Sequence, residues 1–361
     1  AGDAGHCYDG GAWQSVPDCV RRRPLLAGAG RGITRCDYDK ECHVLRHVLA
    51  TARRGDPESV VRSIERFSVE GSRWLKIAGD EKGAVLDDLV RALAPRGAPR
   101  LVVEFGCYVG YSSCRMARLL RPTGGRVVSV EVDPVHACIA RSVLEHAGLA
   151  DSVTIYVGHS EDAIPHLREV CNDTSIDAVF MDQRGTRFHI DLMALEAQGL
   201  LADGCVVAAD NVLKPGAPYF LWHLQSHEQR YGRLTVVSLR EFAAETVEDW
   251  MTLARFRPTA APAKLVPGPP GLAELVFASD HARARSCAGR IPGEVGEGEW
   301  AFHAQELRKA YAEVGINPRV VEVLRHKDGT PYVDWPSDML DAGCMCSAQG
   351  GARVAEEREA R

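Results

Sequence analysis

No stretch of this 361-residue sequence stays apolar for the roughly 18 consecutive residues that a membrane-spanning helix requires, so we expect no such span. A basic excess is also lacking. The formal net charge is -6 and the pI is about 6.1, which gives no general case for binding nucleic acid or an anionic membrane surface. Internal repeats are absent. What remains is an ordinary globular composition, 45% apolar and 25% charged, in a length that suits one large domain with extensions.

Zinc-like ligand spacing is absent too, although the chain has twelve cysteines. No second ligand pair stands at a zinc-like interval, and we expect the Cys344 and Cys346 pair to lie on the surface rather than to bind a soft metal. Four other cysteines fall within predicted core elements, where a thiol behaves as a small apolar group: Cys107, Cys114, Cys138 and Cys205. We therefore expect a reducing, cytoplasmic location. Residue 1 is Ala rather than Met, so a targeting segment cannot be judged from this sequence.

Helices are expected before residue 100. Residues 1–33 are rich in Gly and Arg without clear periodicity, and we expect a low-order extension there. Asp56 followed by Pro57 predicts a helix start, because Asp caps the first turn and Pro fits the first helical position. Apolar residues then recur at helical spacing in two segments: Val60, Val61, Ile64 and Phe67, and Leu86, Leu89, Val90 and Leu93.

Strands and helices alternate after residue 100. Short β-branched runs stand at 101–104, 126–132, 153–157, 177–181 and 204–209, with helical stretches between them at about 111–121, 134–147, 161–171 and 188–200. Two further strands are expected at 234–239 and 250–256. Continuous apolar strands separated by helices predict an α/β fold of the Rossmann-like kind, in which helices cover both faces of a seven-stranded, mostly parallel sheet.

The chain changes character after Phe256. A proline-rich linker at 257–271 separates the predicted domain, residues 34–256, from a C-terminal extension at 272–361. Within that extension, one helix is expected near 299–314, and its role is not predicted.

Acidic side chains follow the predicted strands at their carboxyl ends, where ligands of open α/β sheets bind. Gly106 and Gly110 let backbone approach a ligand closely, and an acid that ends the second strand can accept hydrogen bonds from ribose hydroxyls. This combination predicts a nucleoside-bearing cofactor. Tight turns and solvated carboxylates would explain each of these residues alone, but not why they occur together. The residues concerned are Glu104, Ser112, Glu131, Ser160, Asp182 and Asp210.

A metal site is expected beside that pocket. Asp182, Asp210 and Asn211 present three oxygen ligands on neighbouring strand ends, and hard oxygen ligands suit Mg²⁺. Taken alone, an Asp-Asn pair after a strand is more often a turn or a helix cap.

Four motifs together resemble animal catechol O-methyltransferase, from about Asp39 to Phe256. They are GDEKG at 79–83, EFGCYVGYS at 104–112, RMARLL at 115–120 and ADNVLKPGAP at 209–218. The resemblance implies a class I methyltransferase fold, S-adenosylmethionine as cofactor and Mg²⁺ held by Asp182, Asp210 and Asn211. It implies that Glu131 holds the ribose. The implied cofactor pocket consists of Ala78, Glu104, Gly106, Tyr108, Ser112, Glu131, Val132, Ser160, Glu161 and Asp182. The implied acceptor-binding residues are Trp74, Asn211, Pro215 and Glu241.

The resemblance fails at the residue expected to remove a proton. The family carries a tryptophan two residues after the first metal aspartate and a lysine, the general base, three residues after it. Here these positions hold Arg184 and Gly185. Lys214, beside the metal-ligand loop, is the better candidate for a displaced base, and Lys76 is a second one.

Three functions remain open from the sequence. The first is an Mg²⁺-dependent O-methyltransferase acting on a small catechol-like molecule, with no nucleic-acid partner. The second is a catalytically weak S-adenosylmethionine-binding module whose extension binds a partner. The third is an O-methyltransferase with a non-catechol acceptor, because the altered wall at Arg184 would suit an anionic group. The sequence does not indicate the oligomeric state.

Overall fold

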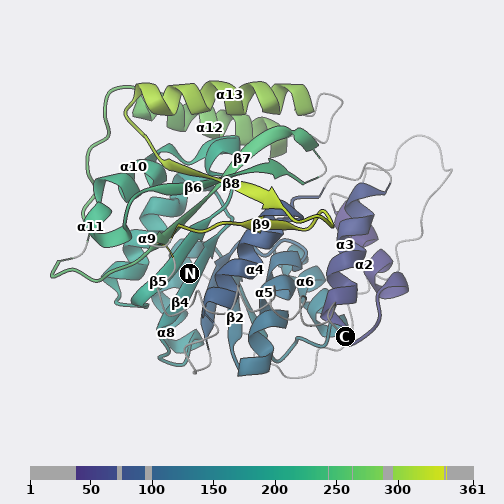
Figure 1. Ribbon diagram of the computed structural model, residues 1–361. Coiled ribbons are helices and arrows are strands. Elements are labelled where there is room, and N and C mark those ends of the chain that lie inside the picture. Colours follow the sequence, from purple (N-terminus) through teal and green to yellow (C-terminus); the bar gives the residue numbers. More distant parts are fainter. Residues whose placement is uncertain are drawn as a thin grey trace, which may run out of the picture.

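The computed structural model describes residues 38–70, 75–93, 100–242, 244–261, 263–287, 296–336 and 339. Their centre is a twisted sheet with the strand order β3-β2-β1-β4-β5-β7-β6-β8-β9 (Figure 1). Strands β1 to β5 run parallel, and β7 lies antiparallel between β5 and β6. The strand bounds are β1 Leu101–Phe105, β2 Arg126–Glu131, β3 Val153–Val157, β4 Ile176–Met181, β5 Leu201–Ala209, β6 Thr235–Glu241, β7 Ala244–Arg255, β8 Arg319–Arg325 and β9 Pro331–Val333.

Helices cover both faces of the sheet, as Figure 1 shows. One face carries α2 Asp39–Thr51, α3 Pro57–Val69, α4 Glu81–Leu93, α5 Tyr111–Leu120 and α6 Pro134–His146. The other carries α7 Ser160–Ala163, α8 Leu167–Val170, α9 Phe188–Ala197, α10 Pro218–Ser226, α11 Glu228–Tyr231, α12 Leu272–Cys287 and α13 Glu297–Glu313. Short turns complete the chain: η2 Arg121–Thr123, η3 Ile164–His166, η4 Gly185–Arg187 and η5 Val212–Gly216.

The strands bury both of their faces, which explains their continuous apolar sequences. Side chains alternate along β1, so Val102 packs in the cluster under α2 to α6, whereas Val103 packs in the opposite cluster. The predicted start of α3 is confirmed, because Asp56 accepts a hydrogen bond from the backbone N–H of Ser59 and Pro57 occupies the first turn. The α/β class is confirmed as well.

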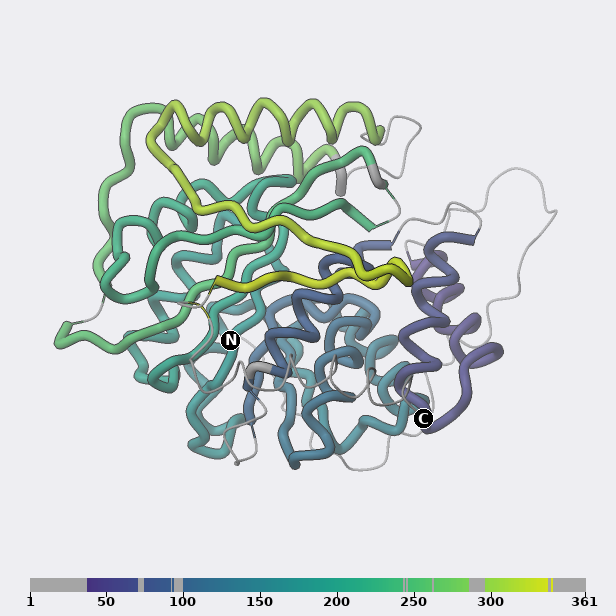
Figure 2. The backbone as a smooth tube through the Cα atoms, viewed as in Figure 1, coloured from purple at the N-terminus to yellow at the C-terminus, as the bar shows by residue number. Residues whose placement is uncertain are grey.

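The sheet is longer than the seven strands expected from the sequence, because β8 and β9 extend it beyond β6. Both strands come from the C-terminal segment. Figure 2 shows this yellow hairpin reaching the purple and blue helices from the start of the chain. There the Arg325 guanidinium lies 2.7 Å from carboxylate oxygens of both Asp80 and Glu81. These ion pairs join the C-terminal hairpin to the start of α4.

Helices α12 and α13 also belong to the main core. Leu272, Leu307 and Tyr311 are buried in the same apolar cluster as β4 and β5. The Tyr311 hydroxyl donates to the carbonyl of Val212 at 2.8 Å and accepts from the N–H of Ala217 at 3.2 Å. The helix expected at 299–314 is therefore present as α13, whereas α12 was not expected. The division of the chain at Phe256 stays a prediction about independent folding, because the described residues on both sides share one core. The expected extension at 1–33 lies outside the described residues.

Candidate active site

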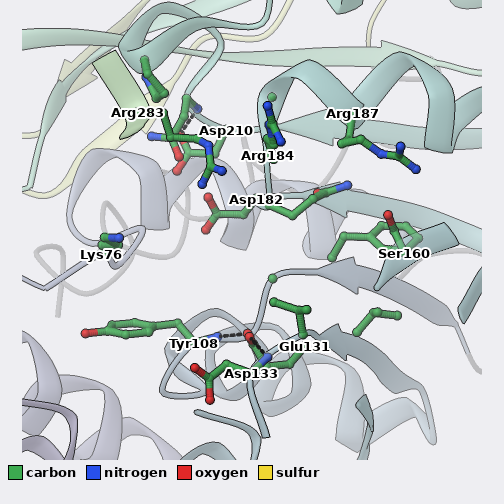
Figure 3. A pocket seen from close by; sticks show the side chains of 18 of the residues that line it. Lys76, Tyr108, Glu131, Asp133, Ser160, Asp182, Arg184, Arg187, Asp210 and Arg283 are labelled. Carbon is green, nitrogen blue, oxygen red and sulfur yellow. Dashed lines mark hydrogen bonds between the residues drawn. The ribbon is translucent and has the colours of Figure 1, made fainter. Parts of the chain in front are cut away.

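A cavity of about 710 Å³ opens at the carboxyl edge of the parallel strands (Figure 3). The loops after β1, β2, β4 and β5 begin at this edge, so side chains far apart in sequence meet there. The structure brings most of the predicted site residues into its lining: Gly106, Tyr108, Glu131, Val132, Ser160, Glu161, Asp182, Asp210, Asn211, Lys214, Pro215 and Glu241. The candidate base Lys76 lines it as well, and Trp74 lies outside the described residues.

The glycine loop follows β1 and is held by the acid that ends β2. One carboxylate oxygen of Glu131 accepts the backbone N–H groups of Cys107 and Tyr108 at 3.0 and 2.8 Å, and the other accepts the N–H of Asp133 at 2.9 Å. Gly106 is required because its φ is +98° and a Cβ there would lie 2.7 Å from the carbonyl oxygen of Asp182. Glu131 therefore shapes the loop and also lines the cavity.

Three of the implied cofactor residues do not line the cavity: Ala78, Glu104 and Ser112. Glu104 is 0% exposed and accepts hydrogen bonds from the hydroxyls of Ser113 and Ser129, the latter at 2.6 Å. Burial raises the pKa of Glu104, although the serine hydroxyls oppose this shift. In this structure Glu104 supports the loop from behind, and direct cofactor contact by these three residues stays a prediction.

The metal-side end of the cavity contains a buried lysine that the sequence reading assigned no role. Lys82, in the first turn of α4, is 1% exposed. Its ammonium nitrogen lies 3.0 Å from Asp210, 2.9 Å from Asp249 and 3.3 Å from Glu241. One cation thus holds three carboxylates that come from β5, β6 and β7 or the loops that follow them.

The carboxylates of this cluster differ in their protonation behaviour. Burial and the neighbouring Asp210 carboxylate raise the pKa of Asp182 well above its usual range. Burial raises the pKa of Asp210 to about 6, against the opposing effect of Lys82. Burial would raise the pKa of Glu241 too, but Lys82 and Lys214 together lower it to about 2. Asp182 and Asp210 are therefore the two acids whose ionised forms need a further cation.

Mg²⁺ fits the chemistry of this donor set. Asp182 and Asp210 supply carboxylate oxygens, and Asn211 adds an amide group. Because a carboxylate only accepts hydrogen bonds, the bond at 2.9 Å from Asn211 to Asp249 assigns Nδ2 to that contact and leaves Oδ1 as the donor atom for a metal. Asn211 has a φ of +61°, a conformation that Asn tolerates. Within the described ranges, no three His, Cys, Asp or Glu side chains form a metal-binding group by themselves.

The position of the family's lysine has no room for a side chain. A Cβ at Gly185 would lie 2.8 Å from the carbonyl oxygen of Gly216 and 3.1 Å from the Cβ of Ala217. The neighbouring Arg184 turns toward α12, where it forms two hydrogen bonds to Asp280 at 3.0 and 2.5 Å. The absence of the family's lysine is therefore accompanied by a different packing of the neighbouring residues, and is more than the substitution of one side chain.

Lys214 takes a place in the cavity instead. It is 6% exposed, and its ammonium nitrogen lies 2.5 Å from Glu241 and 5.2 Å from the centre of the Trp300 ring. Its backbone N–H donates to Asp249 at 2.9 Å, which fixes the turn η5 against β7. Glu241, expected to bind the acceptor, is thus paired with two of the lysines that line the cavity, Lys82 and Lys214.

The C-terminal helices complete the cavity wall with Arg283 from α12 and Trp300 from α13. His303 holds this wall to the implied acceptor site through a 2.8 Å contact between its Nε2 and the carbonyl of Pro215. No local pattern marked either wall residue. Lys82 stood inside the GDEKG motif, and Asp249 directly precedes the strand predicted at 250–256, so these two left a weak signal.

Comparison with known proteins gives consistent matches. A family model described as a methyltransferase domain matches residues 103–212. Catechol O-methyltransferase of Bos taurus is 41% identical over 190 residues, covering 53% of this chain and 68% of the relative, and that of Mus musculus is 42% identical over 186 residues, covering 52% and 68%. The solved O-methyltransferase TomG of Streptomyces achromogenes, in complex with SAM, is 27% identical, with 60% of this chain and 95% of that chain covered and a TM-score of 0.43. In the part of the chain that the structure describes, no helix combines the length and apolar character needed to cross a membrane.

Proposed function

Because the chain belongs to the catechol O-methyltransferase family, we propose that it transfers the methyl group of S-adenosylmethionine to a hydroxyl oxygen of a small catechol-like molecule. One observation carries this proposal. The ribose-binding acid Glu131 and the three metal-donor candidates, Asp182, Asp210 and Asn211, line a single cavity. A methyl donor and a chelated hydroxyl can therefore be held within one enclosure, which reduces the entropic cost of reaction.

The cofactor is proposed to lie along the glycine loop. Glu131 faces its ribose, and Ser160 with Glu161, at the start of α7, flanks its adenine. The Arg187 guanidinium lies 2.7 Å from Glu161, so the two side chains form an ion pair at this end of the cavity. In Figure 3, Tyr108, Glu131 and Asp133 lie in the lower part of the view, and Asp210, Arg184 and Arg283 lie in the upper part. In this proposal the methyl donor and the acceptor bind at opposite ends of the cavity.

Asp182, Asp210 and Asn211 are proposed to hold Mg²⁺. Bound there, the ion would fix two adjacent hydroxyls and lower the pKa of the reacting one. The charges at this end of the cavity favour such an ion. Asp210, Glu241 and Asp249 share the single ammonium group of Lys82, and burial together with the nearby Asp210 carboxylate raises the pKa of Asp182.

Proton removal is assigned to Lys214 within its pair with Glu241. The two groups lie 2.5 Å apart in the cavity. The Lys214 ammonium would first lose its proton to solvent, and its neutral amine would then take the proton of the acceptor hydroxyl while Glu241 accepts a hydrogen bond from the second hydroxyl. A positioned base contributes about 10²–10⁴-fold in rate.

The test is radiolabelled methyl transfer to a panel of catechols, with Mg²⁺ and with EDTA. We expect transfer that depends on Mg²⁺, and its loss in Asp210→Asn while S-adenosylhomocysteine still binds. Asp203→Asn is the matched control, because Asp203 is exposed on the same strand and does not line the cavity. Full activity in EDTA would contradict the metal assignment.

A second candidate function is a cofactor-binding module with weak catalysis and a partner-binding extension. It is favoured by the closed packing at Gly185, which leaves the family's base position without any side chain. Cofactor binding by calorimetry without methyl transfer to any hydroxylated acceptor would support this candidate over the first.

A further inference from the structure

One acid behind the cavity holds residues from several segments of its metal-side end. Asp249 lies in β7, is 0% exposed and does not line the cavity. Its carboxylate oxygens accept hydrogen bonds from Lys82, Asn211, Lys214 and Trp250. Burying a carboxylate is costly unless it is paired and hydrogen-bonded, so these donors explain how the side chain is held in one orientation.

The backbone sets the orientation of this carboxylate. Oδ1 of Asp249 accepts the backbone N–H of Lys214 at 2.9 Å and the backbone N–H of Trp250 at 2.7 Å. A backbone N–H group can only donate, so the atom at this position has to be an oxygen. The main chain of η5 and β7 therefore decides which carboxylate oxygen remains for the cavity residues.

The second oxygen, Oδ2, meets two side chains that line the cavity. It accepts from the Lys82 ammonium at 2.9 Å and from Nδ2 of Asn211 at 2.9 Å. An amide has one donor side and one acceptor side. With its Nδ2 on Asp249, Asn211 keeps its Oδ1 for a ligand, and only that oxygen can bind a cation.

We propose that Asp249 is a positioning residue that sets the affinity for the metal without touching the ion, because it turns the amide oxygen of Asn211 toward it. This inference rests on the proposed function, which assigns Asn211 to Mg²⁺. Groups that orient the direct ligands of a metal commonly change metal affinity by about 10- to 100-fold. The same carboxylate holds the backbone of Lys214, so one side chain fixes both a metal donor and the segment of the candidate base.

Exchanging the two side chains tests this orientation. In Asp249→Asn, the amide oxygen must still accept the two backbone N–H groups, so the new NH₂ group faces Asn211. The amide of Asn211 should then turn over and present its own NH₂ group to the metal position. Calorimetric titration with Mg²⁺, in the presence of S-adenosylhomocysteine, should show binding weakened by about 10- to 100-fold.

The double variant Asp249→Asn with Asn211→Asp should bind Mg²⁺ more tightly again, by about 10-fold. The carboxylate introduced at 211 can accept from the new NH₂ group with one oxygen and offer the other to the ion. Asp also adopts the left-handed backbone found at Asn211, where φ is +61°. A loss of packing alone would not be recovered by this exchange.

Two controls separate orientation from charge and from position on the strand. Glu241→Gln removes one carboxylate from the same cluster but leaves the partner of Asn211 in place, so it should weaken Mg²⁺ binding less than Asp249→Asn. Glu248→Gln, the neighbouring position in β7, does not line the cavity and should bind Mg²⁺ like the wild type.

Wild-type affinity in Asp249→Asn, a loss no larger than that of Glu241→Gln, or a double variant as weak as the single one would overturn the inference. A crystal structure of the wild type with Mn²⁺ requires no variant to fold. There one amide atom of Asn211 should contact the ion and the other Asp249, and separation of these two side chains would also overturn the inference.

Methyl-transfer assays on the same proteins distinguish this inference from the proposed function. Mg²⁺ binding that depends on Asp249 without any methyl transfer contradicts the proposed catalysis alone. Mg²⁺-dependent methyl transfer by a wild type whose metal affinity Asp249→Asn leaves unchanged contradicts the positioning role alone. A wild type that binds neither Mg²⁺ nor Mn²⁺ contradicts both.

Discussion

The ammonium nitrogen of Lys82 lies 3.0 Å from Oδ1 of Asp210, a proposed metal ligand, although 128 positions separate the two residues along the chain. Asp249 and Glu241 take the remaining contacts of the same ammonium group. The pKa of Lys82 is raised well above its usual range, because these three carboxylates outweigh the burial that alone would lower it. Lys82 therefore stays charged and fixes α4 to the metal-side strands.

Replacing Lys82 with methionine should destabilise the protein by about 3–5 kcal/mol, because three buried carboxylates lose their common cation. Urea unfolding followed by circular dichroism would measure the change. Added Mg²⁺ should stabilise Lys82→Met more than the wild type, since the ion binds carboxylates that no longer have a partner. The exposed Lys264→Met is the control and should change stability by less than about 0.5 kcal/mol. Wild-type stability of Lys82→Met would show that the cluster does not need this cation.

Replacing Glu131 with glutamine should weaken S-adenosylhomocysteine binding by about 10- to 100-fold. The carboxylate accepts three backbone N–H groups, and charge-assisted hydrogen bonds of this kind are stronger than those to a neutral amide. Calorimetric titration gives the Kd directly. The exposed Glu145→Gln on α6 should bind like the wild type. Unchanged affinity in Glu131→Gln would remove Glu131 from the cofactor site.

Restoring the family's lysine at position 185 should not raise turnover. Any side chain there meets the Gly216 carbonyl at 2.8 Å, so Gly185→Ala should already cost about 1–3 kcal/mol of stability. Gly298→Ala is the matched control. No atom lies within 4 Å of a Cβ at Gly298, which is inside α13, so this variant should be neutral or more stable. A Gly185→Lys protein with wild-type stability and faster methyl transfer would contradict this account of the packing.

Lys214→Met should lower kcat by about 10²–10⁴-fold if Lys214 removes the proton, with little change in cofactor affinity. Single-turnover methyl transfer and cofactor titration on the same preparation separate these two effects. Lys309→Met, on the exposed face of α13, is the control. Near-normal kcat in Lys214→Met would leave deprotonation to the metal-bound hydroxyl alone.

Stability should fall in acid because of His223, which is 2% exposed and whose ring nitrogens make no hydrogen bond. Burial lowers the pKa of His223 to about 3, with further contributions from His227, His189 and Arg230. The unfolded chain binds this proton below about pH 6.5, whereas the folded chain binds it only below about pH 3. The stability is therefore complete above pH 6.5 and decreases toward pH 3.

This single group changes the free energy of unfolding by at most about 1.4 kcal/mol per pH unit in that range. Urea unfolding of His223→Met at several pH values should show a shallower decrease than the wild type. His281→Met, at an exposed position of α12, should retain the wild-type slope. Identical slopes in all three proteins would contradict a neutral, buried His223.

The sequence by itself determined the elements of the central fold. Apolar periodicity and capping are local properties, so the start of α3 at Pro57, the strands β1 to β7 and the strand-end acids could be read directly. Parallel strand ends share one edge, and for that reason Glu131, Asp182, Asp210 and Asn211 could be expected together, as the cavity lining bears out.

Only the tertiary structure decided the rest. Strand β8 alternates half-buried and exposed residues, a weak signal that pairing with β6 completes. The contact of Lys82 with Asp249, the absence of space at Gly185 and the placing of Arg283 and Trp300 in the cavity depend on chain segments far apart in sequence. Ion pairing and close packing act through space, and local residue patterns carry no record of which distant segment will supply the partner.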